Sequence, residues 1–166
     1  MTEDRVDRIQ AEWRRERPDL DPSPQGVIGR LHRVGDRLRE QLVAVYAQHG
    51  LGEGEFDVLA SLRRAGAPYE LPAGELAEHT MVTSGGMSKR LDRLETAGLV
   101  SRRADAADGR VRRVALTASG LALIDAAFTD HMANEHRLVD ALPASDRATL
   151  ERILRAWLGE IEKEHP

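Results

Sequence analysis

Residues 76–94 read LAEHTMVTSGGMSKRLDRL, and this stretch decides the fold. A short apolar segment, a turn of small residues and a longer helical segment follow one another in the order of a helix-turn-helix. In the longer segment, Met87, Leu91 and Leu94 share one apolar face. The opposite face carries the small and polar residues Gly85, Lys89, Asp92, Arg93 and Thr96. Such a face can enter a DNA major groove, so the sequence predicts a recognition helix from about Ser84 to Gly98.

Small residues stand at the beginning of this predicted helix, where the backbone can approach phosphates and free N–H groups favour anions. A nucleotide-binding P-loop requires G-x-x-x-x-G-K-[ST] after a strand, and the Gly-Gly pair here does not have that spacing. The candidate DNA contacts in this region are Thr83, Ser84, Gly85, Gly86, Ser88, Lys89 and Arg93.

The hydrophobic period changes after Gly98. Residues 99–103 (LVSRR) and 111–116 (VRRVAL) read as short strands, and the turn-rich residues 104–110 (ADAADGR) connect them. The sequence therefore predicts a β-hairpin with Arg110 at its tip, from which an arginine can reach a DNA minor groove. Asp108 can hold the loop backbone or orient an arginine, and Arg112 is a further candidate contact. The alternative is a surface loop without function.

The formal charge of the chain is −4, but charge is unevenly distributed along it. Residues 81–113 contain eight Lys or Arg and four Asp or Glu, a balance of +4, so the remaining residues carry −8. This pattern indicates a basic module in an acidic protein, as expected for a DNA-binding domain. Chance clustering on a solvated surface is the alternative.

Helical periodicity extends over most of the remaining sequence, and the predicted fold class is mainly α (α+β). We expect a winged helix-turn-helix domain over residues 51–120. We expect the helices of residues 1–50 and 121–166, including an extra N-terminal helix that carries Trp13, to form a dimerisation domain. Association of two copies would bury their apolar faces, whereas folding back onto the central module is the alternative.

Several functional classes are excluded or unsupported. The chain has no cysteine, which excludes disulfides, a thiol sensor and a cysteine-ligated zinc site. Residues 1–13 (MTEDRVDRIQAEW) are charged throughout and cannot form the apolar core of a signal peptide, and no apolar run is long enough to span a membrane, so we expect a cytoplasmic protein. We also expect no enzyme activity, cofactor or metal site, because no nucleophile–base pattern, metal set or cofactor fingerprint is present.

Residues 108–120 (DGRVRRVALTASG) resemble the D-x-R-x-x-x-x-x-L-T-x-x-G wing signature of the MarR family of regulators. Residues 88–100 (SKRLDRLETAGLV) are similar to the recognition helix and first wing strand of that family, and the match extends over about residues 51–120. The resemblance implies a homodimer that binds a pseudo-palindromic operator in double-stranded DNA. It also implies a repressor whose DNA binding is relieved by a small anionic or aromatic effector.

Three further stretches, 17–21 (RPDLD), 27–31 (VIGRL) and 55–69 (EFDVLASLRRAGAPY), resemble the PecS branch of the family. That branch implies a urate-like effector, and its ligand residues correspond here to Trp13, Asp57 and Arg90. A tricarboxylate effector such as aconitate or citrate, or a dimer that binds DNA without a ligand, remains an alternative. A plain Asp57–Arg90 salt bridge is the alternative to a ligand site.

Thr117 can cap a long helix that follows it, and we expect Pro143 to end this helix. Two histidines on the helix have two interpretations. His131 lies on its apolar face, and His136 lies nearer the edge. They are either hydrogen-bonded interface residues or a pH-sensitive pair.

Overall fold

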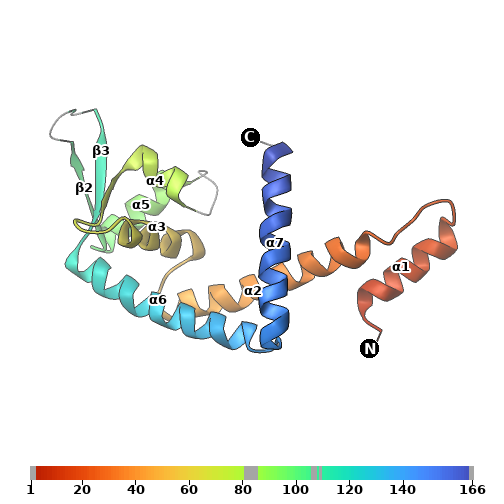
Figure 1. The fold of residues 1–166 in the computed structure, drawn as a ribbon. Helices are drawn as coiled ribbons and strands as arrows, with labels where there is room; N and C mark the ends of the chain where they lie inside the picture. The colour runs from red at the N-terminus through yellow and green to blue at the C-terminus, as the bar shows by residue number, and fades with distance from the viewer. Residues whose placement is uncertain (1–2, 81–85, 106–107, 109, 165–166) are drawn as a thin grey trace. The chain divides into compact units, whose positions relative to one another are not determined.

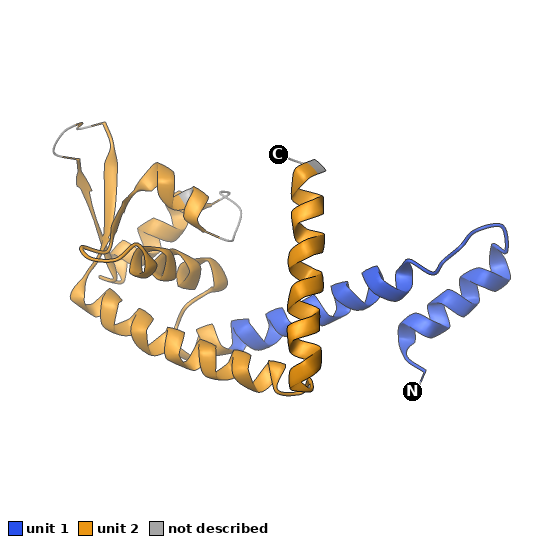
Figure 2. Cartoon of the chain, in the orientation of Figure 1, with its two compact units in different colours: residues 1–44 blue, residues 45–166 orange. Residues whose placement is uncertain are grey.

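The structure is a computed structural model that describes residues 3–80, 86–105, 108 and 110–164 (Figure 1). The chain divides into two compact units, residues 1–44 and residues 45–166 (Figure 2). The described helices are α1 (Arg5–Glu16), α2 (Gln25–Gln48), α3 (Glu53–Arg64), α4 (Ala73–His79), α5 (Met87–Thr96), α6 (Ala118–Val139) and α7 (Ala144–Glu164). The described strands are β1 (Glu70–Pro72), β2 (Val100–Ala104) and β3 (Arg112–Leu116).

In the first unit, α1 is fixed by its N-cap and by polar contacts with the chain that follows it. The Asp4 carboxylate accepts hydrogen bonds from two backbone N–H groups of the first turn, and the Asp7 carboxylate accepts one from Asp4 N in return. Arg30 of α2 donates to both carboxylates, to Asp4 at 2.8 Å and to Asp7 at 2.7 Å. Gln10 is buried and donates from Nε2 to Pro22 O at 2.9 Å. These contacts hold α1 against the start of α2.

The sheet of the second unit has the strand order β1-β3-β2, and all pairs are antiparallel. The hairpin of β2 and β3 was predicted, and its register pairs Val100 with Leu116. The sequence prediction missed β1, which adds an outer strand with Leu71 opposite Val114. This strand has three residues and ends in Pro72, so it lacks the alternation by which a strand is recognised.

The core of the winged domain is formed by α3, α4, α5, the hairpin and α6. Figure 1 shows α3, α4 and α5 beside the sheet, with α6 leading away from it. The fully or almost fully buried apolar side chains are Val58, Leu59, Leu62, Leu76, Leu91, Leu94, Val100, Val114 and Ile124. Burying a leucine of this kind stabilises a fold by about 1.5–3 kcal/mol. The winged domain therefore has a hydrophobic core within a single chain.

Two glycines place the hairpin between α5 and α6. Gly98 has a φ of +70°, and Leu99 N then donates to Leu94 O at 2.9 Å, which closes α5 with a Schellman turn. Gly120 lies against the Leu99 backbone, where a methyl group would overlap the carbonyl oxygen of Leu99. Thr117 caps α6, as predicted, by accepting a hydrogen bond from Gly120 N at 3.0 Å. The last glycine of the wing signature is thus required by close backbone contact.

The long helices have apolar faces that remain exposed in the single chain. Their most exposed large apolar residues include Val27, Val34, Phe128, Val139, Ile153, Leu158 and Ile161. The predicted long helix after Thr117 was expected to continue to Pro143, but α6 ends at Val139. None of the described helices has the length and apolar character needed to cross a bilayer.

Candidate nucleic-acid interface

The two helices of the predicted helix-turn-helix are α4 and α5. The predicted contacts Thr83, Ser84 and Gly85 lie outside the described residues. Gly86 precedes α5 with a φ of +86°, in the left-handed region that glycine adopts without strain. The helix begins at Met87, three residues later than the predicted start near Ser84.

The two faces of α5 are divided as the sequence predicts. Met87, Leu91 and Leu94 are buried against the domain core. The predicted DNA contacts Ser88, Lys89 and Arg93 are exposed on the other side. The buried stripe fixes the helix, and the exposed side presents cationic and hydroxyl groups to solvent.

Arg93 has a partner that sequence reasoning missed. Its Nε lies 3.0 Å from Oε1 of Glu55, a side chain of α3 that is only 8% exposed. The other oxygen of Glu55 accepts a hydrogen bond from Gly52 N at 2.8 Å, at the beginning of α3. Glu55 therefore ties the recognition helix to the start of α3, while the Arg93 side chain remains 69% exposed. No local pattern around Glu55 indicates that this carboxylate faces inward.

Arg90 lies on the flank of α5 and is half-buried. Its guanidinium packs against Gly54 of α3, where a methyl group would lie 2.8 Å from Arg90 Cζ. Asp57 lies one turn further along α3 and is also half-buried. A side chain at position 54 would therefore require the flexible end of Arg90 to move away from α3.

Three arginines of the hairpin are engaged in ion pairs. Arg102 pairs with Asp92 at 2.7 Å and also with Glu95, so β2 is tied to α5. The hydrogen bond from Arg102 lowers the pKa of the Glu95 carboxyl below its usual value, despite an opposing effect of burial. This contact fixes the position of the hairpin relative to the recognition helix.

The other two paired arginines meet the carboxylate of Glu70 on β1. Arg103 donates to both oxygens of Glu70 at 3.0 Å, and Arg113 lies 3.4 Å from one of them. Arg113 also donates to Asp105, and this bond raises the pKa of the arginine. The Glu70 carboxylate is only 9% exposed, so it forms a nearly buried anchor under the wing.

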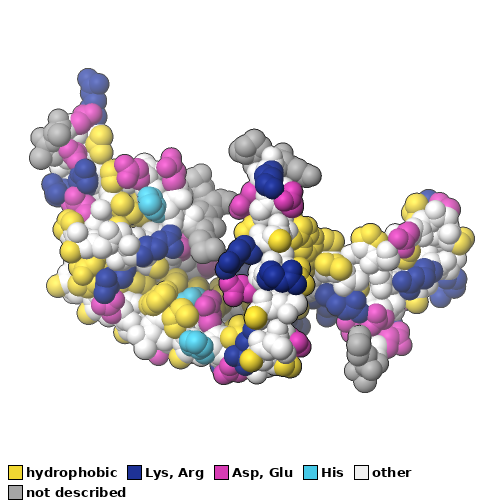
Figure 3. Space-filling model, in the orientation of Figure 1, with side chains coloured by type: hydrophobic (Ala, Val, Ile, Leu, Met, Phe, Trp, Pro, Cys, Tyr) yellow, Lys and Arg dark blue, Asp and Glu magenta, His cyan; other side chains and the backbone are white. Residues whose placement is uncertain are grey.

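The tip of the wing is held by its own carboxylates. Asp108 accepts a hydrogen bond from Arg110 N at 3.0 Å, and Asp105 accepts one from Asp108 N at 3.2 Å. These bonds order the backbone and leave the Arg110 side chain exposed. Figure 3 shows basic side chains along the hairpin of β2 and β3.

The pairing pattern separates the cations of this region into two groups. Carboxylates of α5, of β1 and of the hairpin itself form ion pairs with Arg102, Arg103 and Arg113. Arg93 forms an ion pair with Glu55 of α3 through its Nε. Lys89, Arg110 and Arg112 have no anionic partner among the described residues. Several of the eight Lys and Arg residues in 81–113 are therefore already paired within the protein, and fewer of them are available to a phosphate backbone than the sequence alone suggests.

The predicted effector residues belong to different units. Trp13 is 47% exposed and lines a hollow of about 310 Å³ between α1 and the loop before α2. Asp57 and Arg90 lie on α3 and α5 of the second unit. No group of three or more metal-ligating side chains is present in the part of the chain that the structure describes.

A helix-turn-helix followed by an antiparallel hairpin defines a winged helix DNA-binding domain. The sequence model of the MarR family matches residues 49–111. The chain is 38% identical over 158 residues to the HTH-type transcriptional regulator PecS of Dickeya dadantii, covering 95% of this chain and 93% of that protein. The chain belongs to the MarR family of transcriptional regulators, and PecS is among its relatives.

Other relatives support the same assignment. The HTH-type transcriptional repressor Rv2887 of Mycobacterium tuberculosis is 35% identical over 81% of this chain and 93% of its own length. The crystal structure of a mutant MarR from E. coli, complexed with operator DNA, is 28% identical with a TM-score of 0.69, covering 81% of this chain and 94% of that chain. AbsC, a MarR family regulator from Streptomyces coelicolor, has the same fold, with a TM-score of 0.75 at 24% identity over 87% of this chain and 97% of its own.

Proposed function

We propose that this regulator is a homodimeric repressor that binds a pseudo-palindromic DNA operator and releases it when a small anion binds. The single observation that carries the DNA-binding role is the winged helix itself, with α5 exposing Ser88 and Lys89 on the side opposite its buried stripe. The relationship to MarR from E. coli, a mutant of which has been seen with operator DNA, supports the same role.

In this proposal the recognition helices of two copies enter successive major grooves, with half-sites about 10 bp apart. Gly86 and the hydroxyl of Ser88 lie at the start of α5, near the phosphates. Lys89 and Arg93 contact bases or phosphates. Arg110 and Arg112 of the wing supply further cations, with Arg110 reaching the minor groove. Thr83, Ser84 and Gly85 remain predicted contacts at the turn.

The proposed dimer is supported by the exposed apolar faces of the long helices. On α7, Leu150, Ile153, Leu154, Leu158 and Ile161 recur at helical spacing and are each at least 40% exposed. A contiguous apolar face of this kind in a protein with its own core elsewhere indicates association. The same pattern supports the proposed division into a winged domain, residues 51–120, and a dimerisation domain formed by residues 1–50 and 121–166.

DNA binding is tested by footprinting the purified protein on the DNA upstream of its own gene, over a series of salt concentrations. We expect a protected site with two-fold symmetry and a steep decrease of affinity with salt, because phosphate contacts release counterions. Protection of a single half-site, or no protection of any site at low salt, would contradict the proposed mode of binding.

The proposed effector is urate or a similar planar anion, held by Arg90 with contributions from Trp13 and Asp57. Two parallel hydrogen bonds from a guanidinium suit such an anion. Because ionised Asp57 repels an anion, it has to move or take up a proton when the ligand binds. Arg90 packs against α3 from α5, so displacing it would disturb the recognition helix.

A thermal-shift series with urate, xanthine and citrate tests this part of the proposal. A ligand that binds the folded protein raises the unfolding midpoint and should also release DNA in a gel shift. A shift with citrate alone would favour the tricarboxylate alternative, and no shift with any of the three would favour a ligand-independent DNA-binding dimer. Trp13→Ala should weaken urate binding and spare DNA affinity, whereas Arg90→Ala should harm both.

A further inference from the structure

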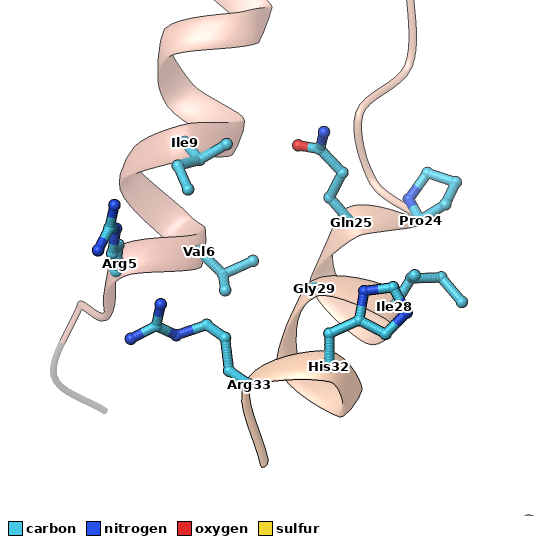
Figure 4. Close-up of a pocket in the computed structure, with 9 residues that line it drawn as sticks. All are labelled: Arg5, Val6, Ile9, Pro24, Gln25, Ile28, Gly29, His32 and Arg33. Carbon is cyan, nitrogen blue, oxygen red and sulfur yellow. The ribbon is translucent and has the colours of Figure 1, made fainter. Parts of the chain in front are cut away.

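The first unit contains a larger hollow that has no part in the functions proposed above. The start of α2 and the facing side of α1 enclose about 600 Å³ (Figure 4). Its apolar wall is formed by Val6 and Ile9 of α1 and by Ile28 and Gly29 of α2. Figure 4 shows Val6 and Ile9 directed toward the space between the two helices, whereas Ile28 projects from the side of α2 away from α1 in this view. The groove therefore offers an aliphatic surface to a small apolar body.

One end of the groove is cationic. Arg5 and Arg33 line it, and Figure 4 shows the two arginines on the same side of the hollow, with His32 on the other side beside Ile28. Neither Arg5 nor Arg33 has an anionic partner among the residues that the structure describes. The neighbouring Arg30, in contrast, is engaged by Asp4 and Asp7. Two unpaired guanidinium groups beside an apolar wall attract an anion that carries an apolar body.

The other end of the groove contains an unpartnered acceptor. Oε1 of Gln25 is buried and receives no hydrogen bond from any described residue. A buried acceptor without a donor costs about 1–3 kcal/mol, and a turn of the Gln25 side chain, which lines the groove, would bring Oε1 to a donor on a ligand. Gln25 and Arg33 are eight residues apart on one helix, a rise of about 12 Å. This length matches a small molecule with polar groups at its two ends.

A second copy of the chain is the competing occupant, and the geometry of α2 argues against it. At about 100° per residue, Gln25, Ile28, Gly29 and Arg33 share one side of the helix. The exposed apolar residues Val27, Val34 and Leu38 lie on the opposite side, while Ile28 of the groove is also 42% exposed and Arg33 borders a neighbouring hollow together with Val34 and Leu38. Most of the apolar face that α2 offers for dimerisation is therefore distinct from the residues that line the groove.

We propose that this groove binds an amphipathic anion. Its carboxylate is held by Arg5 and Arg33, its apolar body lies against Val6, Ile9 and Ile28, and a hydroxyl or amine at its far end donates to Gln25. This site is separate in composition from the proposed effector residues Trp13, Asp57 and Arg90. Its walls are fixed before binding, because the Arg30 contacts and the Gln10 bond to Pro22 already join α1 to α2.

The probe for this site is 4-hydroxycinnamate, a rigid molecule with a carboxylate at one end and a phenol donor at the other. Calorimetry on the intact protein should detect binding of the probe. Arg5→Gln and Arg33→Gln should each weaken that binding by about tenfold, because each removes a charge-assisted hydrogen bond. Arg8→Gln is the matched control, since it removes the same charge from the exposed surface of α1 outside the groove.

The far end is tested by a double comparison of ligand and protein. 4-Methoxycinnamate lacks the phenol donor and should bind more weakly than 4-hydroxycinnamate to the parent protein. The two ligands should bind equally to Gln25→Leu, because that variant has no acceptor to be satisfied. Urate binding should be unchanged in Arg33→Gln and reduced in Trp13→Ala, which separates this proposal from the proposed effector site.

Three results would overturn the proposal. The first is an absence of 4-hydroxycinnamate binding to the parent protein. The second is an equal loss of affinity in Arg8→Gln and Arg33→Gln, which would show a general effect of charge. The third is dissociation of the proposed dimer in Arg5→Gln or Arg33→Gln, measured by light scattering, which would place a second copy in the groove.

Discussion

The winged domain and the long terminal helices contain the same types of hydrophobic residue but bury them to different extents. Leu59 and Leu62 of α3 are completely buried within the chain. Leu158 of α7 is 55% exposed, and Val27 of α2 is 56% exposed. The winged domain closes around its own core, whereas the terminal helices leave large apolar side chains exposed. Stability of the first region is therefore expected to be a property of one chain, and in the proposed dimer the stability of the second would depend on protein concentration.

The largest expected effect comes from comparing the same leucine-to-alanine substitution in each of the two regions. Leu59→Ala should lower the free energy of unfolding by about 2–5 kcal/mol, because it leaves a cavity in a packed core. Leu158→Ala should have a much smaller effect in dilute protein and should instead weaken dimerisation. Urea denaturation at several protein concentrations measures both. Equal losses at every concentration would show that the two regions do not differ as described.

Introducing a charge into the exposed face of α7 should break the proposed dimer. Trp157→Asp or Leu154→Asp places a carboxylate where the proposed interface excludes water, and that burial is costly. Light scattering should show a monomer or an aggregate. Arg152→Asp, on the opposite side of α7, is the control and should remain dimeric. A well-folded dimer in Trp157→Asp would mean that α7 is peripheral to the interface.

Within the winged domain, the unpaired and paired cations should behave differently. Arg110→Ala should reduce operator affinity and lower the salt dependence of binding by about one counterion per subunit. Fluorescence anisotropy over a range of salt concentrations gives both quantities, with Arg14→Ala of α1 as the control. An unchanged affinity and an unchanged slope would remove Arg110 from the interface.

Removing the charge of Glu70 should change DNA affinity and its salt dependence in the opposite direction. Glu70→Gln keeps the shape of the side chain but removes the charge that holds Arg103 and Arg113. Because Arg113 retains Asp105, the released cation is mainly Arg103, which is 57% exposed. Binding to a duplex of random sequence should therefore become tighter and more sensitive to salt. A weaker binding with unaltered salt dependence would instead indicate that Glu70 only supports the wing.

The smallest expected effect concerns the joint between α1 and α2. Hydrogen bonds from Arg30 and from the backbone of Asp7 lower the pKa of Asp4 to about 2. Because the pKa is lowered by folding, the contribution of Asp4 is present above about pH 4 and is lost as the pH falls toward 2. Protection of the α1 amides against hydrogen exchange, relative to the intrinsic rate at each pH, should fall over this range in the parent protein and be less dependent on pH in Asp4→Asn. Titration of Asp4 at its ordinary value would show that the contact with Arg30 does not persist in solution.

Features with local causes were predicted well from the sequence. The buried stripe of α5, the turn at Gly98, the Thr117 cap and the β-hairpin each follow from residues that are close together in the chain. Features that depend on distant partners were missed. The sequence did not indicate β1, because a three-residue strand that ends in proline is defined by its pairing with β3. It also did not indicate the inward-facing carboxylates of Glu55 and Glu70.

The sequence by itself determined the order of the helices and of the hairpin, the wing signature and the family. Helical period, glycine and proline positions and capping residues act through short-range sterics and hydrogen bonding, so they can be read from neighbouring residues. Only the tertiary structure decided which cations are available. Lys89, Arg110 and Arg112 differ from Arg102, Arg103 and Arg113 in their surroundings and not in their side-chain chemistry. Those surroundings are formed by carboxylates on other elements, Glu70 of β1 and Asp92 and Glu95 of α5, which folding brings within a few ångströms.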